Sequence, residues 1–139
     1  MKKALLLLLP TALVLGACDI FGNSEPLDFQ LFVREISELR DEEPFLTART
    51  EFNRIVVQGE IVLNCLGNAP SGNVVQVSRT QFRVTMTEQS GEPSCSAGER
   101  LFEFDAFIGP LVAGSYRVDL IYQRIGAAPE TVLSQQFTL

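Results

Sequence analysis

From Asn53 to the C-terminus, apolar and polar residues alternate with a period of two, and short stretches rich in Gly, Pro, Asn and Ser interrupt the alternation. This is the period of a β-strand with one buried face, and it recurs at spacings of roughly ten residues. No stretch with helical periodicity is long enough to act as a crossover, so we expect antiparallel pairing. The pattern predicts an all-β chain with about six strands in two packed sheets, an antiparallel β-sandwich.

The alternation also assigns a buried face to each strand. The first buried row is Ile55, Val57, Ile61, Leu63 and Cys65. Gly59 lies in the same row and is interpreted as a possible bulge. The later buried rows are Phe82, Val84 and Met86; Phe102, Phe104, Ala106 and Ile108; Tyr116, Val118, Leu120 and Tyr122; and Leu133, Phe137 and Leu139. Residues 64–73, with a turn at 70–73, and the polar residues 89–98 are expected to be loops.

Residues 27–52 carry two overlapping patterns. The residues that alternate as in a strand are Leu27, Phe29, Leu31 and Val33. The residues that follow one face of a helix are Phe29, Phe32, Val33, Ile36 and Leu39. Because residues 34–40 contain good helix formers, we expect a helix or helical turn after Val33, while a seventh strand at 27–33 stays open. The sequence is therefore divided into an N-terminal extension at 27–52 and a sandwich domain at 53–139.

Residues 111–120, with the sequence LVAGSYRVDL, place a tyrosine at the start of a strand that follows a glycine-containing turn. The segment resembles the penultimate strand of immunoglobulin-like and fibronectin type III-like domains, where such a residue forms a tyrosine corner. The resemblance implies that the hydroxyl of Tyr116 bonds back to the turn. The chain departs from immunoglobulins in lacking Trp and in the positions of Cys65 and Cys95. The alternative is a hairpin whose tyrosine simply packs in the core.

Residues 1–17 have the layout of a secretory signal peptide, in which Lys2 and Lys3 precede an apolar run over residues 4–14. As a helix, the apolar segment up to Ala17 would reach only about 21 Å at 1.5 Å per residue, against a hydrocarbon core of roughly 30 Å. We therefore expect a cleaved signal helix rather than a membrane span.

The signal ends in Leu15-Gly16-Ala17-Cys18, an aliphatic and two small residues before a cysteine. This sequence resembles the lipobox of bacterial lipoproteins. The resemblance implies that the signal is cut before Cys18, that the thiol of Cys18 takes a diacylglycerol, and that residues 18–26 form a tether. The expected product is exported and lipid-anchored to a bacterial membrane, at its periplasmic face or at the cell surface. The alternative is a chance cysteine near a conventional cleavage site.

The charge of the chain excludes one class of partner. Removal of Lys2 and Lys3 with the signal would change the formal net charge from −6 to −8, and the remaining basic residues would all be Arg. Binding to nucleic acid requires clustered basic side chains that neutralise phosphates. We therefore expect no nucleic-acid partner.

The cysteine count agrees with export. Three cysteines are present, and lipidation of Cys18 would leave Cys65 and Cys95 in an oxidising compartment. We expect them to form a disulfide, which would stabilise the fold by roughly 3 to 4 kcal/mol in the chain-entropy model. A zinc or redox site is the alternative, but two isolated cysteines without His or C-x-x-C spacing do not favour it.

Candidates for catalysis are few because the chain contains no His, which excludes Ser-His and Cys-His arrangements and imidazole metal sites. Glu103 and Asp105 share one strand face about 7 Å apart, at 3.3 to 3.4 Å per residue, a separation compatible with a glycosidase pair. Arg117 and Asp119 are expected on the outward face of the next strand, and the competing interpretation is that cross-strand ion pairs explain all four residues. We expect no catalytic residue, no metal and no cofactor.

Three functions follow from these features. The first is a lipid-anchored lipoprotein of the cell envelope with a small non-catalytic module, binding or structural, which holds an envelope protein or glycan through loops or an exposed sheet edge. The second is an exported protease inhibitor of immunoglobulin-like fold that inserts the loop at 89–98. The third is a carboxylate-dependent glycan hydrolase with a cleft around Glu103 and Asp105.

Overall fold

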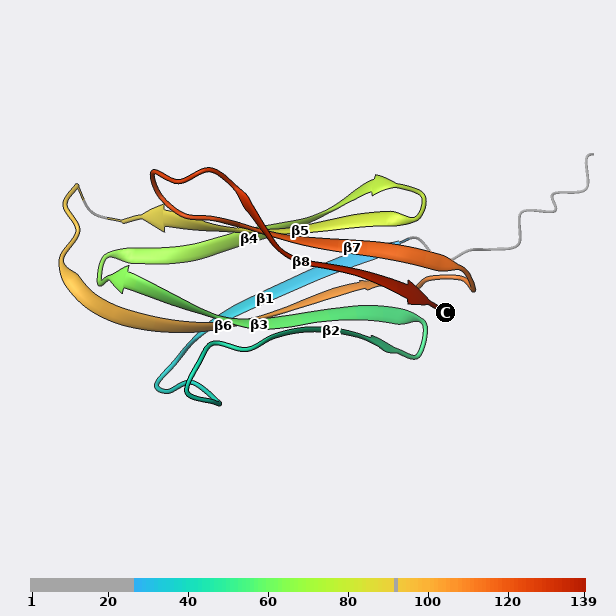
Figure 1. Ribbon diagram of the computed structural model, residues 1–139, viewed down its shortest axis with the longest axis horizontal. Helices are drawn as coiled ribbons and strands as arrows, with labels where there is room; N and C mark the ends of the chain where they lie inside the picture. The colour runs from blue at the N-terminus through green and yellow to red at the C-terminus, as the bar shows by residue number, and fades with distance from the viewer. Residues whose placement is uncertain (1–26, 92) are drawn as a thin grey trace, which may run out of the picture.

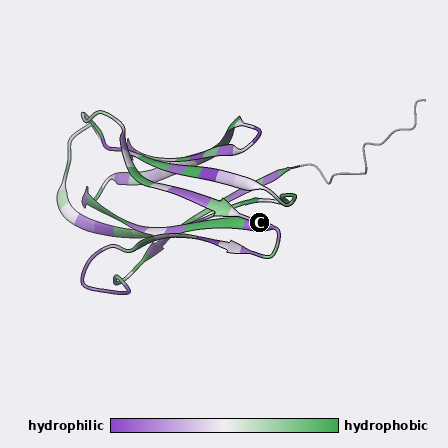
Figure 2. Ribbon diagram, turned by 45° about the vertical axis from the view of Figure 1, so that its right-hand side comes forward, coloured by the Kyte–Doolittle hydropathy of each residue, from purple (hydrophilic) through white to green (hydrophobic). Residues whose placement is uncertain are grey.

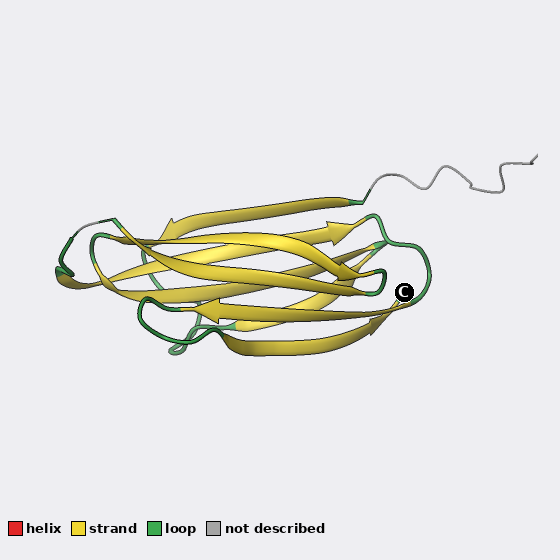
Figure 3. Cartoon of the chain, turned by 90° about the horizontal axis from the view of Figure 1, so that it is seen from above, coloured by secondary structure: helices red, strands yellow, loops and turns green. Residues whose placement is uncertain are grey.

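The computed structural model describes residues 27–91 and 93–139, and their regular structure consists entirely of β-strands (Figure 3). The strands are β1 (Asp28–Ile36), β2 (Leu46–Glu51), β3 (Arg54–Cys65), β4 (Asn68–Ser78), β5 (Gln81–Ser90), β6 (Ala97–Gly109), β7 (Ser115–Gln123) and β8 (Glu130–Thr138). The predicted signal peptide, the lipidation site Cys18 and the tether at 18–26 lie outside the described residues.

The strands form two four-stranded sheets that pack face to face (Figure 1). The first sheet has the order β1-β6-β3-β2 and the second the order β4-β5-β7-β8. Contacts of β1 with β4 and of β2 with β8 place the corresponding edges of the two sheets over one another. The predicted all-β sandwich is confirmed.

One strand pair differs from the antiparallel expectation. β5 and β7 run parallel, with the register extending from Gln81 opposite Arg117 to Thr87 opposite Gln123. A parallel pair needs a crossover connection, which is most often a helix. Here β6 provides it, because the chain leaves the second sheet after β5, passes through the first sheet as β6, and returns as β7. The pairing also departs from the two antiparallel sheets of immunoglobulin domains.

The predicted helix after Val33 is wrong, and so is the division at Asn53. β1 continues to Ile36, and its residues 34–36 pair with residues 101–103 of β6. Pairing with a neighbouring strand outweighs the weak helix propensity of this segment, which amounts to only a few tenths of a kcal/mol per residue. Since β1 and β2 are both strands of the first sheet, the sandwich begins at Asp28.

The predicted loop at 64–73 is also largely strand. β4 begins at Asn68, and residues 70–73 pair with residues 85–88 of β5 instead of turning the chain. Gly72 serves close packing rather than a turn, because a Cβ atom there would lie 2.6 Å from both Leu31 Cδ2 and Met86 Sδ. The connection between β5 and β6 is correspondingly shorter than the predicted 89–98 loop.

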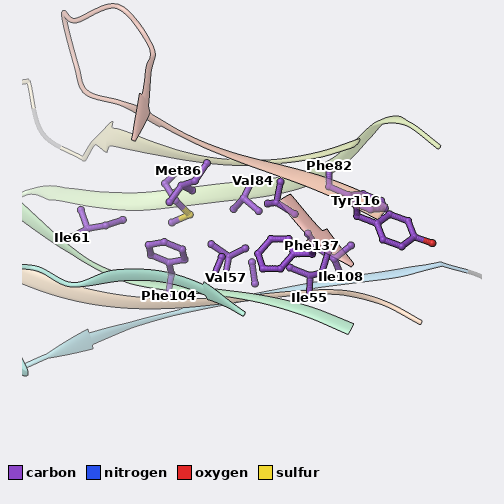
Figure 4. Close-up of a cluster of buried hydrophobic side chains, with 14 of the residues drawn as sticks. Ile55, Val57, Ile61, Phe82, Val84, Met86, Phe104, Ile108, Tyr116 and Phe137 are labelled. Atoms are coloured by element: carbon purple, nitrogen blue, oxygen red, sulfur yellow. The ribbon is translucent and has the colours of Figure 1, made fainter. Parts of the chain in front are cut away.

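The core lies between the sheets and follows the predicted rows, as the alternating hydropathy along the strands indicates (Figures 2 and 4). The largest fully buried side chains include Phe82, Phe104 and Ile55, and burial of each such side chain stabilises the fold by about 1.5 to 3 kcal/mol. Gly59 is not a bulge, since it pairs regularly with Phe104 and a Cβ atom there would lie 2.7 Å from the Phe104 ring. The irregularity lies between Leu63 and Cys65, which leaves Cys65 only partly buried.

At one end of the sandwich the chain enters β1 and two turns lie side by side. Leu111 N donates a hydrogen bond to Asn53 O over 2.7 Å, which joins the β6–β7 turn to the β2–β3 turn. The hydroxyl of Tyr116 donates to Val112 O over 2.8 Å, as expected for a tyrosine corner. Because Asp28 pairs with Gly109, the start of β1 lies at this end, called here the entry end.

The opposite end is closed by the predicted disulfide between Cys65 and Cys95, whose Cα atoms are 5.2 Å apart. Two backbone hydrogen bonds support it, from Leu66 N to Ser96 O and from Gly91 N to Gly67 O. The β3–β4 and β5–β6 connections are thereby fixed to one another. We call this the disulfide end.

Substitution of Cys95 by Ser is expected to lower the free energy of unfolding by about 2 to 5 kcal/mol, because the unfolded chain loses a cross-link between distant positions. Chemical denaturation of purified protein would measure the loss. Cys65→Ser and the double variant should give the same loss as Cys95→Ser, since all three remove one bond. An unchanged denaturation midpoint in Cys95→Ser would contradict the prediction.

Candidate functional site

The edge of the first sheet is incomplete because β2 is much shorter than its neighbour. β2 has 6 residues and β3 has 12. β2 pairs only with Arg54–Gly59, and the last backbone hydrogen bond on this side runs from Glu60 N to Phe45 O over 3.0 Å. Beyond Glu60, no described strand pairs with this edge of β3. Residues 61–65 therefore form an open strand edge near the disulfide end.

A hollow of about 190 Å³ opens between the two sheets beside this edge. Most of its wall is apolar, and Ile61, Met86 and Phe104 lie close together there (Figure 4). The side chains that line it are Pro44, Phe45, Leu46, Glu60, Ile61, Val62, Met86, Phe104, Leu120, Tyr122, Arg124 and Val132. The first sheet supplies one wall and the second sheet the other. Its size suits one large apolar side chain or a similar group.

Tyr122 provides the distinctive polar group of the hollow. Its hydroxyl oxygen is buried and has no hydrogen-bond partner among the described residues. Burial raises the pKa of Tyr122, the negative charge of Glu88 adds to the effect, and the neighbouring Arg124 opposes it in part, so the hydroxyl is a neutral donor at physiological pH. An unpaired buried hydroxyl costs about 1 to 3 kcal/mol, which a ligand that accepts its hydrogen bond would recover.

A second, more polar hollow of about 420 Å³ adjoins the first and shares Val62, Tyr122 and Arg124 with it. The carboxylate of Glu88 is fixed there by the Asn68 side-chain amide, 2.7 Å away, and by the backbone amide of Ile125, 3.4 Å away. The guanidinium of Arg124 lies over the Tyr122 ring at 5.3 Å. The two hollows together combine an apolar recess with donors and a fixed carboxylate at its rim, which is the chemistry of a binding site.

The carboxylates considered for catalysis occupy a different face. Glu103 lies on the outer surface of the first sheet, where residues 37–45 cross from β1 to β2 and cover it, and it is only 4% exposed. It forms ion pairs with Arg34, at 2.5 Å, and with Arg40. Asp105 accepts a hydrogen bond from the Gln58 side chain. Neither carboxylate lines the two hollows.

The environment of Glu103 does not favour acid catalysis. The hydrogen bond from Arg34 holds the pKa of Glu103 below its usual range, and the charges of Arg40 and Arg34 act in the same direction against burial. A general acid requires a raised pKa. The ion pairs suit a structural role, in which Glu103 fixes the 37–45 crossing to the sheet.

The partners expected for Glu103 and Asp105 were wrong. Arg117 and Asp119 lie on β7 in the second sheet and cannot pair with β6. They pair with each other at 3.0 Å. Asp119 also accepts hydrogen bonds from the Gln81 and Ser134 side chains on the neighbouring strands. The alternation in the sequence indicates that all four charged side chains point outward. It does not indicate that β6 and β7 belong to different sheets.

The sequence did not reveal the hollow. The alternation predicts Tyr122 on an inward row, as an ordinary core residue, and no pattern in the sequence points to Glu88 or Arg124. Their spacing carries no motif, because they meet only where β5 and β7 pair in parallel. One feature of the sequence could have indicated the hollow, namely that the stretch before Asn53 is too short to form a strand that covers all of β3.

Comparisons with known proteins add no family to this description. No family model, curated protein or solved structure matches the chain. Within residues 27–91 and 93–139, no group of three or more His, Cys, Asp or Glu side chains is arranged to hold a metal ion. In the same part of the chain, no helix is long and apolar enough to cross a membrane.

Substitution of Glu103 by Gln is expected to lower the free energy of unfolding at pH 7 by about 1 to 2 kcal/mol, because charge-assisted hydrogen bonds are lost. The stability of the parent protein should fall as the pH drops below 4.5, the reference pKa of Glu, because the unfolded chain takes up this proton before the folded chain does. The variant should show a shallower fall.

Denaturation midpoints measured at several pH values between neutral and acidic would test this. Glu99→Gln is the matched control, since Glu99 is an exposed residue of the same strand. Equal pH dependence in Glu103→Gln and the parent would show that the ion pairs do not carry this stability.

Proposed function

We propose that this chain is an exported lipoprotein, anchored to a bacterial membrane through Cys18, whose sandwich is a non-catalytic module that binds an extended segment of an envelope protein. The anchoring part is supported by the sequence of residues 1–18 described above. The binding part is carried by one observation, the apolar hollow beside the open edge of β3.

The edge and the hollow suit one kind of ligand. An extended peptide can add to a free strand edge through backbone hydrogen bonds, while its alternate side chains enter pockets on either face of the sheet. A strand added beside β3 beyond Glu60 would direct every second side chain between the sheets, where the hollow lies. An apolar side chain would fill the recess, and a backbone carbonyl or polar side chain would accept the hydrogen bond of Tyr122.

The protease-inhibitor alternative depended on a projecting loop at 89–98. The connection between β5 and β6 is instead tied to the β3–β4 turn by the disulfide and two backbone hydrogen bonds. The hydrolase alternative depended on a cleft at Glu103 and Asp105, where Arg34 and Arg40 cover one carboxylate. The binding module is therefore the function that the described geometry supports best.

Mass spectrometry of the protein extracted from membranes should find an N-terminus at Cys18 that carries two or three acyl chains. The Cys18→Ser variant should accumulate as an uncleaved precursor or leave the membrane, because no other residue at the cleavage site offers a thiol. A soluble mature protein that begins at another residue would refute the anchor.

A photo-crosslinking amino acid at Val132, on the rim of the hollow, should capture an envelope protein in intact cells. Val75 is the matched control, since both valines are 39% exposed and they lie on opposite edges of the second sheet. The adduct should form from position 132 alone.

Val132→Trp should reduce association with the captured protein several-fold by filling the hollow, whereas Val75→Trp should leave it unchanged. Equal capture from both positions, or association that survives Val132→Trp, would show that the hollow is not the binding site.

A further inference from the structure

The entry end of the sandwich displays two apolar side chains that the described residues leave largely exposed. Phe52, at the tip of the β2–β3 turn, is fully exposed, and Val112, in the β6–β7 turn, is 69% exposed. The hydrogen bond between Leu111 and Asn53 places the two turns side by side. We call Phe52 and Val112 the apolar tip.

The backbone conformation at Phe52 indicates that this side chain does not stabilise the sandwich. Its φ angle is 53°, in the left-handed region that residues with a side chain rarely adopt and in which a bulky residue is an outlier. Gly or Asn would fit this turn with less strain. A fully exposed Phe in this conformation contributes no packing to the sandwich, and an external contact is where it can contribute.

The position of the apolar tip relative to the proposed lipid anchor points to a contact with the membrane. β1 begins at the same end, since Asp28 pairs with Gly109 directly before the β6–β7 turn (Figure 1). Only eight residues, 19–26, separate the proposed anchor Cys18 from Leu27, the first described residue. Even fully extended, the nine steps from Cys18 to Leu27 span about 30 Å at 3.3 to 3.6 Å per residue, and a flexible chain of this length has a typical reach of about 17 Å. The entry end would therefore stay close to the bilayer.

Two arginines near the apolar tip suit lipid headgroups, while Glu51, next to Phe52, is paired with Arg49. Arg54 follows the β2–β3 turn and Arg79 lies in the β4–β5 turn at the same end. Both are exposed, and neither belongs to an ion pair within the described residues. Free guanidinium groups beside an apolar tip can bind lipid phosphates while the tip enters the interface.

We infer that Phe52 and Val112 insert into the surface of the bilayer that holds the lipid anchor, and that Arg54 and Arg79 contact its phosphates. The inference rests on the proposed lipidation of Cys18. It fixes the orientation of the sandwich, with the entry end on the membrane and the disulfide end, with its open strand edge and hollow, directed away from it. Two apolar contacts add to the acyl chains as a second, weaker anchor.

The chain contains no Trp, so a single introduced Trp reports its own surroundings. The full-length protein carrying Phe52→Trp would be purified from membranes and reconstituted in phosphatidylcholine and phosphatidylglycerol vesicles with brominated acyl chains. The emission of the introduced Trp should lie to the blue of that of a control variant, and the brominated lipid should quench it. Leu66→Trp is the matched control, because Leu66 is 50% exposed at the disulfide end, and it should be neither shifted nor quenched.

Mass spectrometry of the same preparations separates the two ways of failing. Acylated Cys18 together with Phe52→Trp emission equal to that of Leu66→Trp would overturn the membrane contact and leave the anchor intact. Absence of acyl chains on Cys18 would overturn the proposed anchor and the inference that rests on it. Circular dichroism of both variants confirms that the strands persist.

Discussion

The two sheets are held together by the inward rows of β3 and β6 on one side and of β5 and β7 on the other. Their side chains include Ile55, Phe104, Phe82 and Val118, all almost completely excluded from water. Burial of apolar area contributes about 25 cal/mol per Å², so these central strands supply most of the favourable free energy of folding. The other features depend on this core, because the edge strands add little to it and can therefore vary in length and pairing.

The first sheet shows two such variations, one on its outer face and one at the β2 edge. On the outer face, the long connection from β1 to β2 buries Glu103 and Glu60, and Arg34, Arg40 and backbone amides compensate their charges. At the β2 edge, the same connection ends too late for β2 to cover all of β3. The packing between the sheets stays open there, and the hydroxyl of Tyr122 has no hydrogen-bond partner within residues 27–91 and 93–139. The connection at residues 37–45 therefore both helps to compensate the buried carboxylates of the first sheet and leaves the β2 edge of the sandwich open.

The two ends of the sandwich have different characters. The disulfide end is cross-linked and contains the open edge with its two hollows, whereas the entry end contains the tyrosine corner and the exposed Phe52. In the proposed function, a short tether joins the entry end to the membrane. The site for the extended peptide then lies in the half of the molecule farthest from the bilayer, where a partner in the envelope can reach it.

The sequence by itself determined the all-β class and the inward rows, because the backbone alternates side chains between two faces. The hydrogen bond of Tyr116 is implied by a resemblance over a few residues, and the pairing of Cys65 with Cys95 is inferred from the number of cysteines rather than from local structure. The sequence did not determine which strands are neighbours. Residues 34–36 fit a helix until β6 pairs with them, and residues 70–73 fit a turn until Leu31 and Met86 pack against Gly72.

Only the tertiary structure decided the parallel pairing of β5 with β7, the separation of Asp105 from Asp119 into different sheets, and the hollow at Tyr122. These features depend on contacts between segments far apart in the chain. The free energy of such contacts comes from shared burial and from complete backbone hydrogen bonding, which no single segment encodes.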